Sequence, residues 1–266
     1  MESELKMVYD PSFPAYIKGT FNSFLLLKFF SAEIYRDYFL SGKLYMRQHS
    51  AFVNEELGKG RSDCTEGADF AVTPFYANTF PDVKLCVADD DEVYVEATEY
   101  TEKPANYRDK QLFISRPMQS QRRNIFSMYT LWCNKEKELT AKIDVENMKN
   151  FGEFGVLVLD TNTFFNRIAM AANADMSISR MNCGFVHYIE GRNVMRLTPF
   201  TKPASGFSYQ KEFRFCAETD NEDLLELDTH ISFRDIAIPI QLQEFADTVI
   251  FKNGNLYFKA DTSAGR

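Results

Sequence analysis

A short segment in the C-terminal third of the chain carries the residue types best suited to chemistry. Between Phe207 and Phe215, aromatic residues alternate with Gln210, Glu212 and Arg214. This period of two is typical of a half-buried strand, predicted here over residues 207–216, with Gln210 and Glu212 on one face about 6.6 Å apart. A glutamate on a rigid strand, beside an amide and an arginine, suits a reaction that develops positive charge on a sugar carbon. Cleavage of a glycosidic bond through an oxocarbenium-like transition state is such a reaction.

The composition of the chain is that of an ordinary globular protein, with 45% hydrophobic and 26% charged residues in 266. A chain of this length can bury a substantial core, and we expect a single α+β domain over residues 1–266. Its 25 Phe and 13 Tyr favour a strand-rich interior. The formal net charge of -8 argues against a protein that coats nucleic acid, because such binding gains its energy by neutralising many phosphates.

Several sequence features exclude common classes of site. The cysteines are odd in number and lack a Cys-x-x-Cys pair, so we expect reduced thiols and a cytoplasmic location. The histidines and cysteines show no recognised metal spacing, and no metal is expected. The sequence has no Walker loop and no dinucleotide glycine fingerprint, which removes kinases, ATPases and ordinary dehydrogenases. Its polar, acidic start is unlike a signal peptide, its apolar runs are short, and no membrane role is expected.

Alternation, caps and turn residues predict mostly strands with a few helices. A buried strand over residues 22–30 should lead into a helix over 32–40, with Ser31 as its N-cap and Gly42 closing it. Asn253-Gly254 is the strongest hairpin signal. Further strands are expected at 43–46, 83–88, 93–101, 113–115, 124–132, 156–159, 184–189 and 225–231, and helices at 145–150 and 163–172.

Taken in chain order, short motifs resemble those of the ADP-ribosyltransferase superfamily, in which three separate strands line one NAD cleft. The third motif of that superfamily is [QE]-x-E on a strand, matched here by Gln210-Lys211-Glu212. Bacterial relatives in toxin and antiphage systems often follow it with an aromatic residue and an arginine, matched by Phe213-Arg214. The second motif is an aromatic-serine element on a strand, for which Phe126-Ser127 is the best candidate.

Two further matches lie nearer the N-terminus. The first motif is usually an arginine or histidine on the opening strand, whereas this sequence departs from the pattern and offers Lys28. The bacterial relatives also carry a D-x-x-E-G segment after the first helix and strand. The run from Asp63 to Gly67 fits that form, with Arg61 two residues upstream, inside a long polar loop that we expect to be functional.

The resemblance implies a mixed, barrel-like pair of antiparallel sheets with flanking helices, and transfer of ADP-ribose from NAD to an acceptor with loss of nicotinamide. NAD would be a substrate, used without a metal. By this resemblance Glu212 stabilises the positive charge on the ribose and hydrogen-bonds its 2′-hydroxyl. Gln210 would hold the acceptor or the ribose, and Ser127 would brace Glu212 or the nicotinamide ribose.

The NAD-binding residues implied by the resemblance are Lys28, Arg61, Asp63, Phe126, Ser127 and Arg214. Lys28 or Arg61 would pair the pyrophosphate, a task that asks more for reach than for exact geometry when the cation is a lysine. The aromatic residue that stacks on nicotinamide would be Tyr45, Phe52 or Phe126.

The acceptor implied by the resemblance is RNA, DNA or protein, and a toxin of this kind would need a neutralising antitoxin protein. Two other interpretations stay open. A catalytically silent module of the same fold would bind a nucleotide or a protein, and Lys28 in the place of arginine or histidine favours it. A nuclease is the third, although the sequence offers no convincing metal-binding carboxylate cluster. A Q-x-E on an amphipathic strand is also common by chance.

Overall fold

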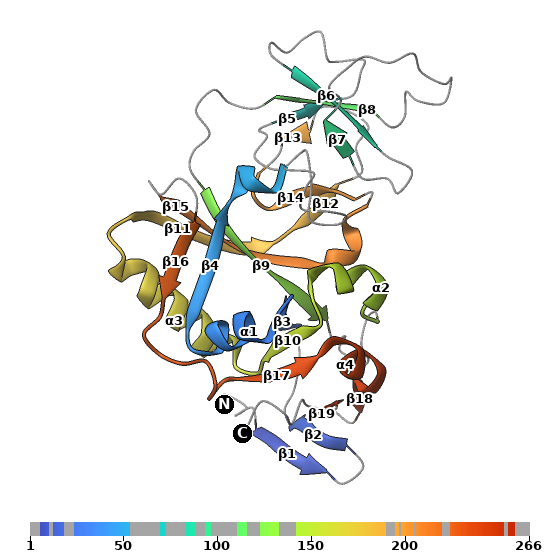
Figure 1. The fold of residues 1–266 in the computed structure, drawn as a ribbon, viewed down its shortest axis with the longest axis vertical. Helices are drawn as coiled ribbons and strands as arrows, with labels where there is room; N and C mark the ends of the chain where they lie inside the picture. The colour runs from blue at the N-terminus through green and yellow to red at the C-terminus, as the bar shows by residue number, and fades with distance from the viewer. Residues whose placement is uncertain are drawn as a thin grey trace.

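A computed structural model gives the protein an α+β architecture with mostly antiparallel sheets, which confirms the predicted class (Figure 1). It describes residues 6–10, 13–18, 24–53, 70–72, 83–88, 94–96, 111–115, 123–132, 142–189, 195–196, 198–204, 206–219, 224–252 and 255–258. An eight-stranded sheet lies in the middle of the molecule, with a five-stranded sheet toward one end and a four-stranded sheet toward the other (Figure 1).

The central sheet is built around one long strand, β9. Its strands in spatial order are β11 (Ile178–Phe185), β15 (Glu212–Thr219), β9 (Arg123–Trp132), β3 (Phe24–Phe30), β10 (Phe154–Val158) and β17 (Ala237–Gln241), and β4 (Lys43–Gln48) with β16 (Leu224–Asp228) branches from β9. All of these pairs are antiparallel. One edge of β9 therefore pairs with β15, and its other edge pairs with β3 over one part and with β4 over another.

Both faces of the central sheet are covered by helices. Buried residues of α1 (Glu33–Leu40) and α3 (Thr161–Ala174) pack on one face, and those of α2 (Val145–Met148) and α4 (Leu242–Thr248) pack on the other. In β3, Leu26 joins the first core while Leu25 and Leu27 join the second. Burial on both faces explains why this strand is a nearly continuous apolar run.

The first helix begins differently from the prediction. The N-cap of α1 is Ala32, in an extended conformation and without a side-chain hydrogen bond, so the prediction of Ser31 as the cap is wrong. Packing holds this helix, since Phe39 and Leu40 are fully buried, and each such burial stabilises the fold by about 1.5–3 kcal/mol. Gly42 closes the helix as predicted, at φ +102°, where a Cβ would lie 2.4 Å from the Ile231 carbonyl oxygen.

Three smaller sheets complete the described structure. The strands of the four-stranded sheet are β1 (Lys6–Asp10), β2 (Phe13–Lys18), β19 (Asn255–Phe258) and β18 (Ile250–Lys252), and those of the five-stranded sheet are β13 (Met195–Arg196), β5 (Phe70–Val72), β8 (Gln111–Ser115), β6 (Val83–Ala88) and β7 (Tyr94–Glu96). The short strands β12 (His187–Ile189) and β14 (Thr201–Pro203) pair in parallel. The hairpin predicted at Asn253-Gly254 is confirmed by the antiparallel pair of β18 and β19, and the hairpin predicted from residue 83 onward by β6 and β7.

The segment of greatest chemical interest departs from the predicted strand. The strand β15 begins at Glu212, whereas Ser208–Gln210 forms a 3-10 helix, η6. Between them Lys211 adopts a left-handed conformation, with φ 41°. The strand predicted from residue 207 is therefore wrong over its first five residues. Within the described ranges, no helix is long and apolar enough to cross a bilayer.

Candidate functional site

The central sheet divides at β9 and leaves a fork. The strand β3 pairs with residues from Tyr129 to Trp132 of β9, and β4 pairs with Asn124 and Ile125. The two strands diverge over residues 126–128, which lie between the two sets of pairs. A cavity of about 230 Å³ opens in this fork.

Five consecutive residues of β9, 125–129, line the cavity. Successive side chains of a strand point to opposite faces, so a cavity on one face of a complete sheet would contact alternate residues only. Contact with all five indicates that the cavity reaches the open edge of the strand inside the fork as well as one face of the sheet. Ser127 is in the middle of this run, and its carbonyl oxygen points toward the diverging strands, where it accepts a hydrogen bond from the Lys28 ammonium at 2.7 Å.

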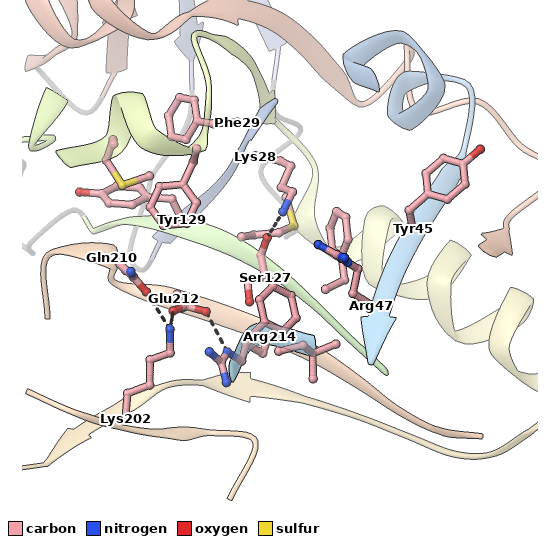
Figure 2. Close-up of a pocket in the computed structure, with 16 residues that line it drawn as sticks. Lys28, Phe29, Tyr45, Arg47, Ser127, Tyr129, Lys202, Gln210, Glu212 and Arg214 are labelled. Carbon is pink, nitrogen blue, oxygen red and sulfur yellow. Dashed lines mark hydrogen bonds and ion pairs between the residues drawn. The ribbon is translucent and has the colours of Figure 1, made fainter. Parts of the chain in front are cut away.

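Lys28 crosses the fork from β3. Besides its bond to Ser127, its ammonium lies 4.5 Å from the centre of the Phe126 ring, a cation–π contact. A lysine inside an otherwise apolar strand would be costly to bury without such partners. Figure 2 shows the side chain reaching from β3 to the carbonyl of Ser127, at the wall of the cavity.

A buried cluster of charges forms the opposite wall. The two carboxylate oxygens of Glu212 accept hydrogen bonds from different cations, one from Lys202 at 2.8 Å and the other from Arg214 at 2.8 Å (Figure 2). The side chains of Lys202, Glu212 and Arg214 are 7%, 8% and 1% exposed. Arg214 also donates to the carbonyl oxygen of Pro199 at 2.7 Å. Charge-assisted hydrogen bonds between buried groups are the strong kind, so this carboxylate is firmly positioned.

Gln210 joins this cluster by a route that the alternation pattern did not indicate. Lys202 donates to the Gln210 side-chain oxygen at 2.9 Å as well as to Glu212, so one ammonium ties the amide to the carboxylate. The left-handed Lys211 turns the chain between the 3-10 helix and β15. The amide and the carboxylate therefore meet through a turn and a shared lysine, not through one face of a strand.

Strand register explains why residues far apart in sequence face the same cavity. In an antiparallel ladder, residues opposite each other point to the same face. Arg47 of β4 is opposite Ile125, while Arg214 is opposite Ser127 and Glu212 is opposite Tyr129. These residues alternate along β9, so their side chains share one face, and all of them line the cavity.

The cavity is strongly cationic. Among the described residues that line it, Lys28, Arg47, Lys202 and Arg214 are cations, and Glu212 is a carboxylate. The described wall therefore has a formal charge of +3. An excess of positive charge around an enclosed space concentrates anions, which makes a phosphate-bearing ligand a better fit than a cationic one.

An apolar region adjoins the charged wall and is formed by Phe29, Tyr129, Met148 and Phe151. Burial, with a smaller contribution from the charge of Asp144, raises the pKa of the Tyr129 hydroxyl, which stays protonated. That hydroxyl is buried and has no hydrogen-bond partner among the described residues. Buried polar groups are usually paired, so it is a donor that a bound polar group could use.

The structure brings together six of the residues predicted from sequence in one cavity: Glu212, Gln210, Lys28, Phe126, Ser127 and Arg214. The proposed stacking residues Tyr45 and Phe52 also line it. Arg61 and Asp63 lie outside the described residues.

Sequence reasoning missed two cations of the site, Lys202 and Arg47. The strand that carries Lys202 has three residues, too few to show a period. Arg47 could have been found, because it follows Tyr45 at a spacing of two and lies one residue beyond the strand predicted over 43–46.

The search for similar proteins gives no support for a family. No protein-family model, no curated protein and no solved structure matches this chain. The geometry of the site therefore carries the functional argument.

Proposed function

We propose that this protein is an ADP-ribosyltransferase that cleaves NAD and transfers ADP-ribose to a nucleic-acid or protein acceptor. The observation that supports it most is convergence: Lys28, Ser127 and Glu212 come from three strands, and all line one cavity. A carboxylate, a hydroxyl and a cation there supply a negative charge for the ribose, a hydrogen-bonding group for its hydroxyls and a positive charge for the pyrophosphate.

In the proposed reaction, the bond between the ribose anomeric carbon and the nicotinamide nitrogen breaks with its electron pair on nicotinamide, and a nucleophilic atom of the acceptor bonds to that carbon and releases a proton. Positive charge grows on the ribose as nicotinamide leaves. The carboxylate of Glu212 would stabilise that charge and hold the ribose 2′-hydroxyl, and loss of such a preorganised group lowers a rate by about 10²-fold or more. The cavity volume of about 230 Å³ lies below the usual range for drug-sized ligands, about 300–1,000 Å³, so part of NAD would extend from the mouth.

The partners of Glu212 favour a second candidate, a catalytically silent module that binds an anionic nucleotide. Both carboxylate oxygens already pair with a cation, and the cluster of Lys202, Glu212 and Arg214 has a formal charge of +1. A cluster with net positive charge stabilises an oxocarbenium ion less than a lone carboxylate would. A carboxylate has about four acceptor sites, however, so pairing with two cations does not by itself prevent it from accepting a hydrogen bond from a ribose hydroxyl.

Labelled NAD separates the two candidates. The protein is incubated with NAD labelled in the ADP-ribose part and with separate pools of RNA, DNA and protein, and released nicotinamide is measured alongside. Wild type should release nicotinamide and label one pool, and Glu212→Gln should do neither. Glu218→Gln is the matched control, because Glu218 is on the same strand and does not line the cavity.

The variants must be shown to be folded, by circular dichroism and by an unfolding midpoint, before their activity is compared. NAD binding without consumption or labelling by wild type would support the silent module and overturn the transferase. If wild type and Glu212→Gln consumed NAD equally, Glu212 would have no role in the reaction.

A further inference from the structure

Two residues of β4 form a surface beside the charged wall: Arg47, to which the proposed chemistry gives no role, and Tyr45, one of three candidates to stack on nicotinamide. The burial of β4 alternates along the strand, with Leu44 and Met46 buried and Tyr45 and Arg47 exposed. Tyr45 and Arg47 therefore share one face, about 6.6 Å apart along the strand, and both line the cavity. An aromatic ring and a guanidinium at this spacing match the two parts of a nucleotide, its base and its phosphates.

The Tyr45 ring is exposed but oriented by its neighbours. It makes an edge contact with Tyr38, with ring centroids 6.3 Å apart, and it remains 37% exposed. Glu226 is directly opposite on β16, and burial followed by the hydrogen bond and charge of Glu226 raises the pKa of Tyr45. A ring held in this way offers a face on which a base can stack without first losing much conformational freedom.

Arg47 supplies the charge. Figure 2 shows its side chain extending from β4 toward Ser127, while Tyr45 lies at the outer edge of the cavity. Among the described residues, no hydrogen bond or ion pair engages the Arg47 guanidinium, and Lys28 lies across the fork on the same cavity. A planar guanidinium with available donors is well suited to bind a diphosphate in a bidentate manner.

The distance between Arg47 and Glu212 suits the two ends of a dinucleotide. From Ile125 to Tyr129, their respective partners on β9, the strand advances about 13 Å, and crossing from β4 to β15 adds about 10 Å sideways, so the two Cα atoms lie about 16 Å apart. Both side chains extend into the space between. Arg47 can thus hold phosphates while Glu212 stays at the ribose beyond them.

We propose that Tyr45 and Arg47 form a subsite for a nucleoside 5′-diphosphate, in which the base stacks on Tyr45 and the diphosphate binds Arg47. The assignment of this nucleotide to the ADP half of NAD rests on the proposed function. The subsite itself does not, because a nucleoside diphosphate without nicotinamide should bind there.

Calorimetric titration with ADP and with inorganic pyrophosphate tests the subsite. Arg47→Ala should weaken both ligands by about tenfold or more, because it removes the bidentate cation. Tyr45→Ala should weaken ADP by about tenfold but leave pyrophosphate unchanged, and Tyr45→Phe should restore ADP binding because the ring remains. Arg180→Ala and Tyr35→Ala are matched controls at exposed positions off the cavity and should bind like wild type.

The results also distinguish this inference from the proposed function. No ADP binding by wild type, or normal ADP binding by folded Arg47→Ala and Tyr45→Ala, overturns the subsite. Normal ADP binding by Glu212→Gln is expected, since Glu212 lies at the other end. If Arg47→Ala and Tyr45→Ala weakened ADP binding but the protein never consumed NAD, the subsite would be supported and the proposed transferase activity would be overturned. If both variants consumed NAD with an unchanged KM, the transferase activity would be supported and the subsite would be overturned.

Discussion

The buried cluster around Glu212 makes a prediction in which the effect of one substitution changes sign. Lys202→Met should reduce the stability of the wild-type protein slightly, but should increase the stability of the Glu212→Ala variant. The reason is that Lys202 and Arg214 are both buried and both pair with the same carboxylate.

The magnitudes follow from these contacts. Glu212→Ala leaves two buried cations without their carboxylate, and breaking a buried pair in this way costs about 3–5 kcal/mol. Lys202→Met in the wild type loses the hydrogen bonds to Glu212 and Gln210. It also replaces a buried ammonium by an apolar side chain of similar length, so the net cost should be about 0–2 kcal/mol. In the Glu212→Ala background the same change removes a buried ammonium that has lost its carboxylate, and a gain of about 1–3 kcal/mol is expected.

Urea unfolding at neutral pH measures these free energies in the four proteins of a double-mutant cycle. A coupling of about 1–5 kcal/mol between the two positions is expected. If Lys202→Met lowered the free energy of unfolding equally in both backgrounds, Lys202 and Glu212 would not interact as described and the buried cluster would be wrong.

Three further predictions concern the fork, a turn and a surface ion pair. Lys28→Met removes the donor to the Ser127 carbonyl, and should cost about 1–3 kcal/mol of unfolding free energy and weaken pyrophosphate binding, whereas Lys28→Arg should retain most of that binding. If Lys28→Met changed neither the free energy of unfolding nor pyrophosphate binding, Lys28 would not be part of the site. Gly42→Ala should destabilise the fold by more than about 1 kcal/mol, because φ is +102° there and a Cβ would contact backbone, and a thermal midpoint equal to wild type would contradict this. The hydrogen bond from Arg167 holds the pKa of Asp235 below its ordinary value of 3.8, so this pair stabilises the fold above that pH and the contribution is lost as the pH falls through the lower, folded value. Arg167→Ala should therefore cost about 0.2–1 kcal/mol at neutral pH and less in acid, and an equal cost at both would show that the ion pair is not the cause.

The convergence of the site could be anticipated in part from sequence. Strongly apolar or alternating runs predicted β3 and β9, and the order of Lys28, Ser127 and Glu212 along the chain suggested that their strands would meet. Burial on one or both faces leaves a clear periodic signal in strands of this length, which is why these elements were predictable.

The details that shape the site left no such signal. The aromatic alternation before Glu212 resembled a strand, whereas the chain forms a 3-10 turn and then a left-handed residue at Lys211, a lysine that nothing local marks for that conformation. The pairing of Lys202 with Glu212 and the division of the β9 edge between two strands are tertiary contacts. They depend on register between distant segments, which one sequence does not encode locally.

Whether Glu212 faces the ribose of bound NAD is tested most directly by an experimental structure of the protein with an NAD analogue that cannot lose its nicotinamide. The analogue should bind in the fork between β3 and β4, with its ribose 2′-hydroxyl hydrogen-bonded to Glu212 and its diphosphate at Arg47 and Lys28. Binding elsewhere on the protein, or a ribose turned away from Glu212 within this cavity, would contradict it.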